Sequence, residues 1–320
     1  MKEVNYDIFN GDADGICALH QLCLANPRES ELITGVKRDI QLVQKVDASV
    51  NDNLVVLDIS FDKNRMAVEQ ALNAGANVAY YDHHFAGTLP KHENLTCFIN
   101  TNAETCTSLI VNEQLKGRYV KWAITAAFGD NLHVQAIELS EQIGMSVTEI
   151  ESLKTLGSLI NYNGYGSAVE DLHFAPDALY QIIKNYEDPF DFIKNEKAFL
   201  TLKQGYEADL EKVQSIAPDL LTDKHGVYLL PDASWARRIS GVYGNILTQQ
   251  TPSRAHAILS LIDDKYYVVS VRAPIDNREG ADDLCRQFET GGGRKAAAGI
   301  NKLPISEYSV FVEKFKAQFK

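Results

Sequence analysis

Acidic and histidine side chains follow three short apolar runs in the first third of the chain. The runs are NYDIF (5–9), NLVVL (53–57) and NVAYY (77–81), and each leads into residues that carry carboxylates. A further acidic residue lies in AAFGDN, at a predicted helix end. The candidate ligands are, in chain order, Asp12, Asp14, Asp58, Asp82, His83, His84 and Asp130.

These residue types suit a site for divalent metal ions. If the runs are strands of one parallel sheet, their carboxyl ends lie along one edge and the side chains converge there. Carboxylates and imidazoles gathered at one point need a countercharge, which a divalent cation supplies. A lone D-x-D-G is more often a turn or a helix cap, and Asp58 alone is as often a loop residue as a ligand. Asp82-His83-His84 is much less ordinary, so the joint pattern favours a metal site.

Strands and helices alternate in the first half of the chain, which predicts a parallel sheet with helices on its faces. We expect strands at 5–9, 53–59, 77–84 and 97–100, with a helix at 65–75. Residues 105–215 are predicted to be mainly helical. The last hundred residues show a different order of predicted elements. We expect a strand at 226–231, a hairpin around Asp263-Asp264 and a helix at 281–289, which together predict a smaller α/β domain. The predicted division is a first domain at 1–190, a helical connector at 191–220 and a second domain at 221–320.

A second group of residues suits phosphate. SVRAP (270–274) and ETGGGRKAAAGI (289–300) lie about twenty residues apart in the predicted second domain, on either side of a short helix. Glycines let backbone N–H groups approach an anion, and arginine offers a bidentate fork. The alternative is a loop that packs on a helix through small residues. The candidates are Arg272, Gly291, Gly292, Gly293, Arg294 and Lys295.

The composition of the chain is that of a globular protein and argues against a membrane-spanning or disulfide-rich one. The 320 residues are 45% hydrophobic and 23% charged, as in ordinary globular proteins, and no apolar run is long enough for a membrane span. The N-terminal residues do not form the apolar core of a signal peptide, so we expect a cytoplasmic protein. The five scattered cysteines show neither zinc-site spacing nor a disulfide framework.

The net charge of −12 argues against a general binder of duplex DNA. That charge is uneven, because residues 221–320 carry a net +3 and residues 1–220 a net −15. An acidic part suits cations and a mildly basic part suits phosphate, although two domains with unremarkable surfaces would give the same numbers.

The order GDADG, VVLDIS, YDHHFAG and GDN resembles the four motifs of the DHH phosphoesterase superfamily. The resemblance implies two divalent ions, with Mn²⁺ preferred and Mg²⁺ as the other option, and hydrolysis of phosphate esters or anhydrides. It also implies metal ligands at Asp12, Asp14, Asp58, His83 and Asp130, and a bridging position between the ions for Asp58. His83 is implied to be supported by Asp82, and His84 to lie nearer the substrate phosphate, which makes Asp58, Asp82 and His84 the implied catalytic residues.

The sequence departs from the family pattern at two positions of the first motif. Many members have a metal-binding histidine four residues before the first aspartate of this motif, where this chain has Ile8. NGDADG is similar to the RecJ-type form D-x-D-x-D-G, with Asn10 in place of its first aspartate. We therefore expect one of the two ions to be held more weakly.

The second group of motifs resembles the DHHA1 domain, the usual partner of a DHH domain, with Arg294 where that family commonly has histidine. Together the two resemblances predict a phosphodiesterase that hydrolyses short single-stranded RNA or DNA, or linear dinucleotides, to mononucleotides. Alternatives are a RecJ-like single-strand exonuclease, a hydrolase of a small phosphate compound (cyclic dinucleotide, nucleoside bisphosphate or pyrophosphate) and a nucleotide-binding sensor. We expect neither a membrane nor duplex DNA as a partner, and a homodimer stays open.

Overall fold

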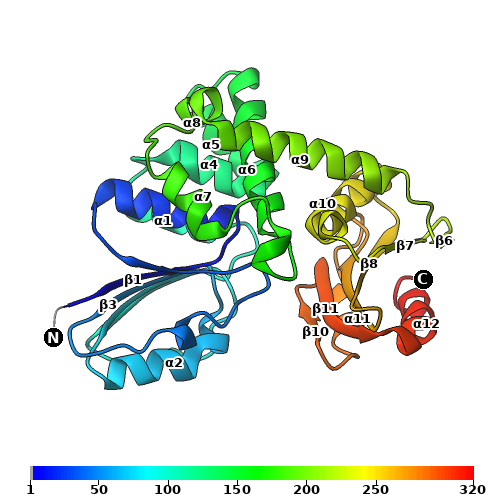
Figure 1. Ribbon diagram of the computed structural model, residues 1–320, viewed down its shortest axis with the longest axis horizontal. Helices are drawn as coiled ribbons and strands as arrows, with labels where there is room; N and C mark the ends of the chain where they lie inside the picture. The colour runs from blue at the N-terminus through cyan, green and yellow to red at the C-terminus, as the bar shows by residue number, and fades with distance from the viewer. Residues whose placement is uncertain (1–2) are drawn as a thin grey trace. The chain divides into compact units, whose positions relative to one another are not determined.

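The computed structural model describes residues 3–320, which form two compact units that meet in the sequence between Lys203 and Gln204 (Figure 1). The division between them falls inside helix α9 (Lys197–Gln214), within the range predicted as the connector. The assignment of a catalytic role to one unit and a binding role to the other stays a prediction. None of the helices within residues 3–320 has the length and apolar character that a membrane crossing requires.

The first unit is built on a five-stranded parallel sheet with strand order β2-β1-β3-β4-β5. Four of the strands match the apolar runs predicted from the sequence, within two residues at each end. The three-residue strand at the β2 edge was not predicted, because it is too short to show an alternating pattern. The strands are β1 (Asn5–Phe9), β2 (Glu31–Ile33), β3 (Asn53–Leu57), β4 (Asn77–Asp82) and β5 (Leu95–Ile99).

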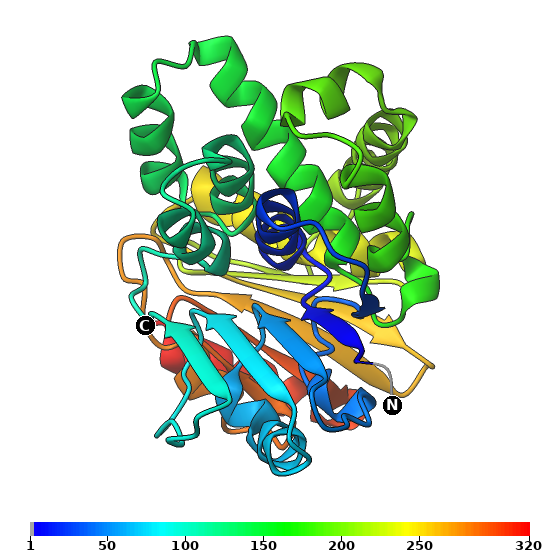
Figure 2. The ribbon, with the colours of Figure 1, turned by 90° about the vertical axis from the view of Figure 1, so that its left-hand side faces the viewer.

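Helices cover both faces of this sheet, as predicted (Figures 1 and 2). On one face α2 packs through Val68 and Leu72 onto the strand residues Ile8, Val56 and Tyr80, which are all buried. On the other face α1 packs against α3 and α4. The helices are α1 (Ala13–Ala25), α2 (Phe61–Asn73), α3 (Thr107–Gln114), α4 (Val120–Gly129), α5 (His133–Gln142), α6 (Val147–Gly164), α7 (Pro176–Ile183) and α8 (Pro189–Asn195), with 3₁₀ turns at Val43–Lys45 and Val169–Asp171.

The second unit contains a mixed sheet with strand order β10-β11-β9-β8-β7-β6. Only β7 and β8 pair in parallel, and β8 and β9 form the predicted hairpin. Asp263 and Asp264 both have positive φ (53° and 49°), as a tight hairpin turn requires. The elements are β6 (Leu220–Leu221), β7 (His225–Leu230), α10 (Ser234–Gln250), β8 (Ala255–Ile262), β9 (Tyr266–Arg272), α11 (Ala281–Cys285), β10 (Gly291–Gly293), β11 (Ala297–Pro304), a 3₁₀ turn (Ile305–Glu307) and α12 (Tyr308–Gln318).

One helix of the second unit is shorter than predicted. We predicted a helix over 281–289, whereas α11 ends at Cys285 and the chain then turns into β10. The carbonyl of Cys285 lies where a side chain on Gly291 would have to be, 1.7 Å from an ideal Cβ. Gly291 therefore lets the strand pass directly over the end of the helix.

Candidate metal centre

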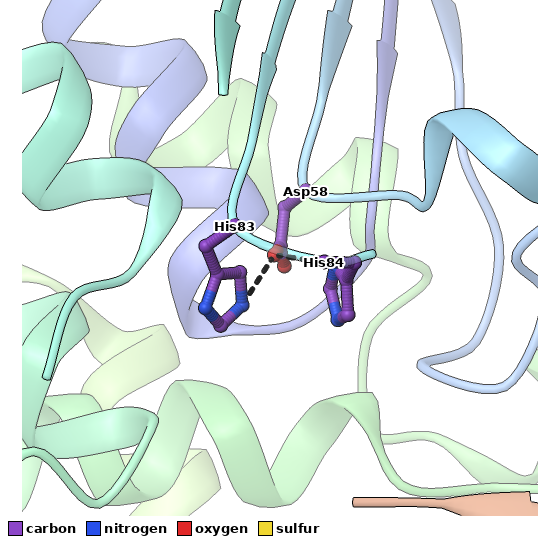
Figure 3. Close-up of side chains that lie close together, drawn as sticks. All are labelled: Asp58, His83 and His84. Carbon is purple, nitrogen blue, oxygen red and sulfur yellow. Dashed lines mark ion pairs between the residues drawn. The ribbon is translucent and has the colours of Figure 1, made fainter. Parts of the chain in front are cut away.

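The sheet topology brings the predicted ligands of the first unit together. The strands β1, β3 and β4 are neighbours and run in one direction, so their carboxyl ends meet at one edge. Asp12 caps α1 just beyond β1, Asp58 follows β3 with a positive φ of 59°, and Asp82 ends β4. Figure 3 shows His83 and His84 on either side of the Asp58 carboxylate.

Four side chains direct ligand atoms at one small volume. The Nε2 atom of His83 lies 3.4 Å from Oδ1 of Asp58, 4.0 Å from Oδ2 of Asp14 and 3.9 Å from Oδ2 of Asp130. Two ligand atoms that are each about 2.0–2.2 Å from one ion lie about 3–4 Å apart. The arrangement therefore fits a divalent ion held by nitrogen and carboxylate oxygen. Ligand atoms of Asp58, His83 and His84 also lie within 4.8 Å of one another.

The hydrogen bonds of His83 present one ring nitrogen to this volume. Its Nδ1 atom is 3.0 Å from the carbonyl oxygen of Thr105, so Nδ1 carries the proton and donates it there. Nε2 then faces the carboxylates and is the atom that can offer a lone pair to a cation. A hydrogen bond donated by the ring nitrogen that does not bind the metal is the usual way in which proteins orient a ligating histidine.

The predicted support of His83 by Asp82 is wrong. Asp82 instead accepts a hydrogen bond from Nδ1 of His84, at 2.7 Å. The Nδ1 atom of His83 is engaged by the Thr105 carbonyl, so it is not available to Asp82. His84 thus has its Nδ1 fixed by a buried carboxylate, while about a third of its side chain remains exposed (34%).

Backbone N–H groups hold the two aspartates of the first motif. Asp14 accepts bonds at 2.7 Å from both Thr107 and Ser108, at the start of α3. Asp12 accepts bonds from the N–H groups of Asp14 and Gly15, at 3.0 and 3.1 Å, and so caps α1. Helix N-termini favour negative charge, and these bonds hold both carboxylates in place.

The electrostatics of the cluster show why a cation fits. Burial raises the pKa of Asp58 well above its ordinary value, and the charges of Asp14 and Asp12 raise it further. Burial also raises the pKa of Asp14, to which the charges of Asp130 and Asp12 add, although His83 opposes them. Buried carboxylates this close together repel one another, and a divalent ion removes that repulsion.

Two residues of the site were missed from the sequence, Lys37 and Asn161. The ammonium of Lys37 pairs with the Asp12 carboxylate, donates to Oδ1 of Asn161 at 3.0 Å and lies 3.9 Å from Oδ1 of Asp130. Burial opposes the charge on Lys37, but Asp12 above all holds the pKa of this lysine above its usual range. The same contact outweighs burial at Asp12 and lowers the pKa of its carboxyl.

A signal for one of these two residues is present in the sequence. Lys37 follows the short edge strand β2, so the rule that located the aspartates would also have placed it at this edge of the sheet, had the strand been recognised. Asn161 lies near the end of α6, in the Asn161–Gly164 segment, for which the sequence pattern indicates no role. The same helix end packs on the site, since an ideal Cβ on Gly164 would be 3.1 Å from Cα of Asp12.

The predicted phosphate-binding residues lie together in the second unit. Arg272 pairs in register with Ala297 on β11, and Arg294 closes the β10–β11 turn through bonds to the same residue. Arg272 donates to Oδ1 of Asn245 at 2.6 Å and to the carbonyl of Gly241 at 3.1 Å, so its guanidinium is held against α10. Lys295 forms an exposed ion pair with Glu279 at 3.0 Å.

The three glycines form a strand at the edge of the sheet. Gly291, Gly292 and Gly293 pair antiparallel with Ile300, Gly299 and Ala298. Gly293 has a φ of 140°, and an ideal Cβ there would be 2.5 Å from Cα of Ala298. At Gly292 the same position is open. Packing thus explains Gly291 and Gly293, whereas a Cβ at Gly292 would meet no atom of the described chain within 4 Å beyond the adjacent residues.

These features define an α/β protein of two units, with a cluster of aspartate and histidine at the carboxyl edge of a parallel sheet. Neither a protein-family model nor a curated protein matches the sequence. Solved structures do match, and they show that the chain has the fold of the DHH proteins, including RecJ.

Three solved structures illustrate the likeness. RecJ from Thermus thermophilus, in complex with Mn²⁺, is 14% identical, with a TM-score of 0.65 over 98% of this chain and 52% of that chain. The DHH domain of a protein described as a member of a family of ribosomal proteins is 14% identical, with a TM-score of 0.66 over 98% and 86%. PggH, a pGpG-specific phosphodiesterase from Vibrio cholerae, is 14% identical, with a TM-score of 0.58 over 99% and 100%. The chain spans about half the length of the Thermus RecJ structure.

Proposed function

We propose that this protein is a metal-dependent phosphodiesterase that hydrolyses short oligonucleotides or linear dinucleotides to mononucleotides. The observation that carries the proposal is that carboxylate oxygens of Asp14, Asp58 and Asp130 all lie within about 4 Å of the Nε2 atom of His83. A site of carboxylates and one imidazole suits Mn²⁺ or Mg²⁺. The fold shared with a Mn²⁺-bound RecJ and with a pGpG-specific phosphodiesterase supports the same chemistry.

A divalent ion bound here would stabilise charge on the phosphoryl oxygens and make hydroxide accessible at neutral pH. The protein's contribution is to orient the groups around it. Thr105 fixes the tautomer of His83, and the start of α3 fixes the Asp14 carboxylate. Because these partners are backbone groups, the ligands are already in position before substrate arrives.

His84 is the side chain best placed to meet the substrate phosphate. It lies beside the proposed ligands, with Nδ1 4.0 Å from Oδ1 of Asp58. Burial opposes its protonation, but the hydrogen bond and charge of Asp82 raise the pKa of the imidazole. A protonated His84 carries a ring N–H on Nε2 that can bind a phosphate oxygen or give a proton to the leaving oxygen.

The second unit supplies substrate binding in this proposal. Arg294 and Lys295 are exposed and provide cations, and the glycine strand β10 provides a sheet edge, for a second phosphate or a terminal nucleotide. Arg272 is held against α10 and would orient this group from the neighbouring strand. Binding energy from such a remote contact can be used to place the scissile phosphate.

A RecJ-type single-strand exonuclease is the second candidate. It is favoured by the NGDADG form of the first motif and by the TM-score of 0.65 to RecJ. The acidic character of the protein counts against it, since tracking a long strand usually requires a basic groove.

The two candidates are separated by substrate length. We would compare kcat/KM for a labelled dinucleotide and a labelled 20-mer, side by side, in Mn²⁺. The first proposal expects the dinucleotide to be preferred, with mononucleotides as the products. A preference for the 20-mer would instead support the exonuclease, and hydrolysis of neither, under conditions where Mn²⁺ binds, would contradict both.

A further inference from the structure

The ammonium of Lys37 lies among oxygen atoms that would otherwise suit a second metal ion. It contacts Asp12, Asn161 (3.0 Å) and Asp130 (3.9 Å). Oxygen ligands of this kind are those a hard divalent cation selects. Asp130 spans both positions, because its Oδ2 lies 3.9 Å from the His83 nitrogen while its Oδ1 faces Lys37. The lysine thus stands where an ion adjacent to the first one would stand.

The backbone of Lys37 is fixed on both sides. Its N–H donates to the carbonyl of Gly164 at 2.9 Å, and its carbonyl accepts from Nδ2 of Asn10 at 3.2 Å. A carboxylate at position 10, as in the RecJ-type motif, could not donate the second of these bonds. The ammonium also lies 5.4 Å from the centre of the Tyr165 ring, within range of a cation–π interaction. Asn10, at the family's aspartate position, here holds the segment that carries the lysine.

The Asp12 side of the cluster is also poor in ligands for a metal. The position at which many DHH proteins have a histidine is Ile8, which is fully buried in the core beneath the sheet. Oδ1 of Asp12 is already engaged by two N–H groups at the start of α1, which leaves Oδ2 for a cation. A second ion would therefore have to displace a paired lysine, with isoleucine instead of histidine at the family's position.

We propose that the protein binds one divalent ion, at Asp14, Asp58, His83 and Asp130, and that the Lys37 ammonium replaces the second ion of the two-ion site that the family resemblance implies. The lysine keeps a fixed positive charge beside Asp12, with N–H groups that can bind an oxygen of the substrate phosphate. The ion count is independent of the reaction, whereas the contact with phosphate rests on the proposed function.

The test is the number of Mn²⁺ ions bound per chain, measured by equilibrium dialysis together with electron paramagnetic resonance. Wild type is expected to bind one ion, with the spectrum of an isolated Mn²⁺. Lys37→Ala and Lys37→Ser, which release Asp12, Asn161 and the second oxygen of Asp130 from the ammonium, are expected to bind two ions with an exchange-coupled spectrum. Lys154→Ala is the matched control, because the ion pair of Lys154 with Glu151 is exposed and neither residue belongs to the proposed site, and it should bind one.

Wild type with two coupled ions would overturn the proposal, and so would Lys37 variants that still bind only one. Wild type that binds no Mn²⁺ would contradict the metal centre and, with it, the proposed function. One ion in wild type and two in the Lys37 variants, without hydrolysis of any phosphodiester, would support the lysine's role and refute the proposed function. The outcomes therefore distinguish the two claims.

Discussion

His20 on α1 gives the first unit a stability that depends on pH. Its ring is buried (1% exposed), its Nε2 donates to the carbonyl of Tyr186 at 2.8 Å, and it packs edge-on against Trp122 at 4.7 Å between ring centres. Burial lowers the pKa of this histidine from 6.5 to about 4, although the bond to Tyr186 opposes the shift. His20 is therefore neutral in the folded protein at pH values where an unfolded chain would protonate it.

The size of the effect follows from linkage. Between pH 6.5 and 4 the unfolded state binds more protons at this position, so the free energy of unfolding falls as the pH falls through that range. The contribution is fully present above pH 6.5 and fully lost below pH 4. A shift of roughly 2.5 pKa units corresponds to about 3 kcal/mol in total, of which about 2 kcal/mol is lost between pH 7 and pH 5.

The assay is urea unfolding at pH 7 and pH 5, followed by the fluorescence of Trp122 in a Trp235→Phe background. Wild type is compared with His20→Gln, which cannot be protonated, and with His92→Gln, which changes an exposed histidine. We expect His20→Gln to lose about 2 kcal/mol less between the two pH values than wild type, and His92→Gln to behave like wild type. Equal losses in wild type and His20→Gln would refute the reasoning.

Three further predictions concern the site. Hydrolysis is expected to require added Mn²⁺ or Mg²⁺, to stop in excess EDTA and to return on adding metal, and full turnover by metal-free protein would contradict the metal centre. Asp58→Asn is expected to weaken Mn²⁺ binding by more than the roughly 10- to 100-fold typical of a residue that only supports a ligand, as measured by calorimetry. Asp263→Asn is the matched control, because Asp58 and Asp263 both have positive φ (59° and 53°) and of the two only Asp58 faces the cluster. Equal Mn²⁺ affinities of the two variants would show that Asp58 is not a ligand. Arg294→Ala is expected to lower kcat/KM on dinucleotides roughly ten- to a hundredfold, the value of a charge-assisted bond. Arg286→Ala is the control and should stay near wild type, as should hydrolysis of bis-p-nitrophenyl phosphate by either variant. Equal losses of Arg294→Ala on both substrates would contradict the proposed binding of a second phosphate by Arg294.

Much of the site follows from a single rule about parallel sheets. Short apolar runs predicted four of the five strands, and three of these runs lead into acidic residues. The common edge of their carboxyl ends brings Asp14, Asp58 and His83 together, and Asp130 joins them from the end of α4. The rule works because burial on both faces leaves a strong apolar signal in each strand. It missed β2 because three residues carry no such signal, and Lys37 was missed with it.

The rest depends on contacts that sequence spacing does not encode. Asn161 reaches the site from α6, more than a hundred residues after Lys37, and nothing in the helix pattern indicates that its end would pack on Asp12. The partner of Asp82 was predicted wrongly because a sequence motif does not specify which of two adjacent histidines contacts the carboxylate. In the structure Asp82 pairs with His84. The short α11 likewise reflects a local steric requirement at Gly291.

The most direct test of the metal centre is anomalous diffraction from crystals soaked in Mn²⁺. The account predicts a strong peak about 2.0–2.3 Å from Asp14, Asp58, His83 and Asp130. A Mn²⁺ peak elsewhere on the protein, with none at these four side chains, would contradict it.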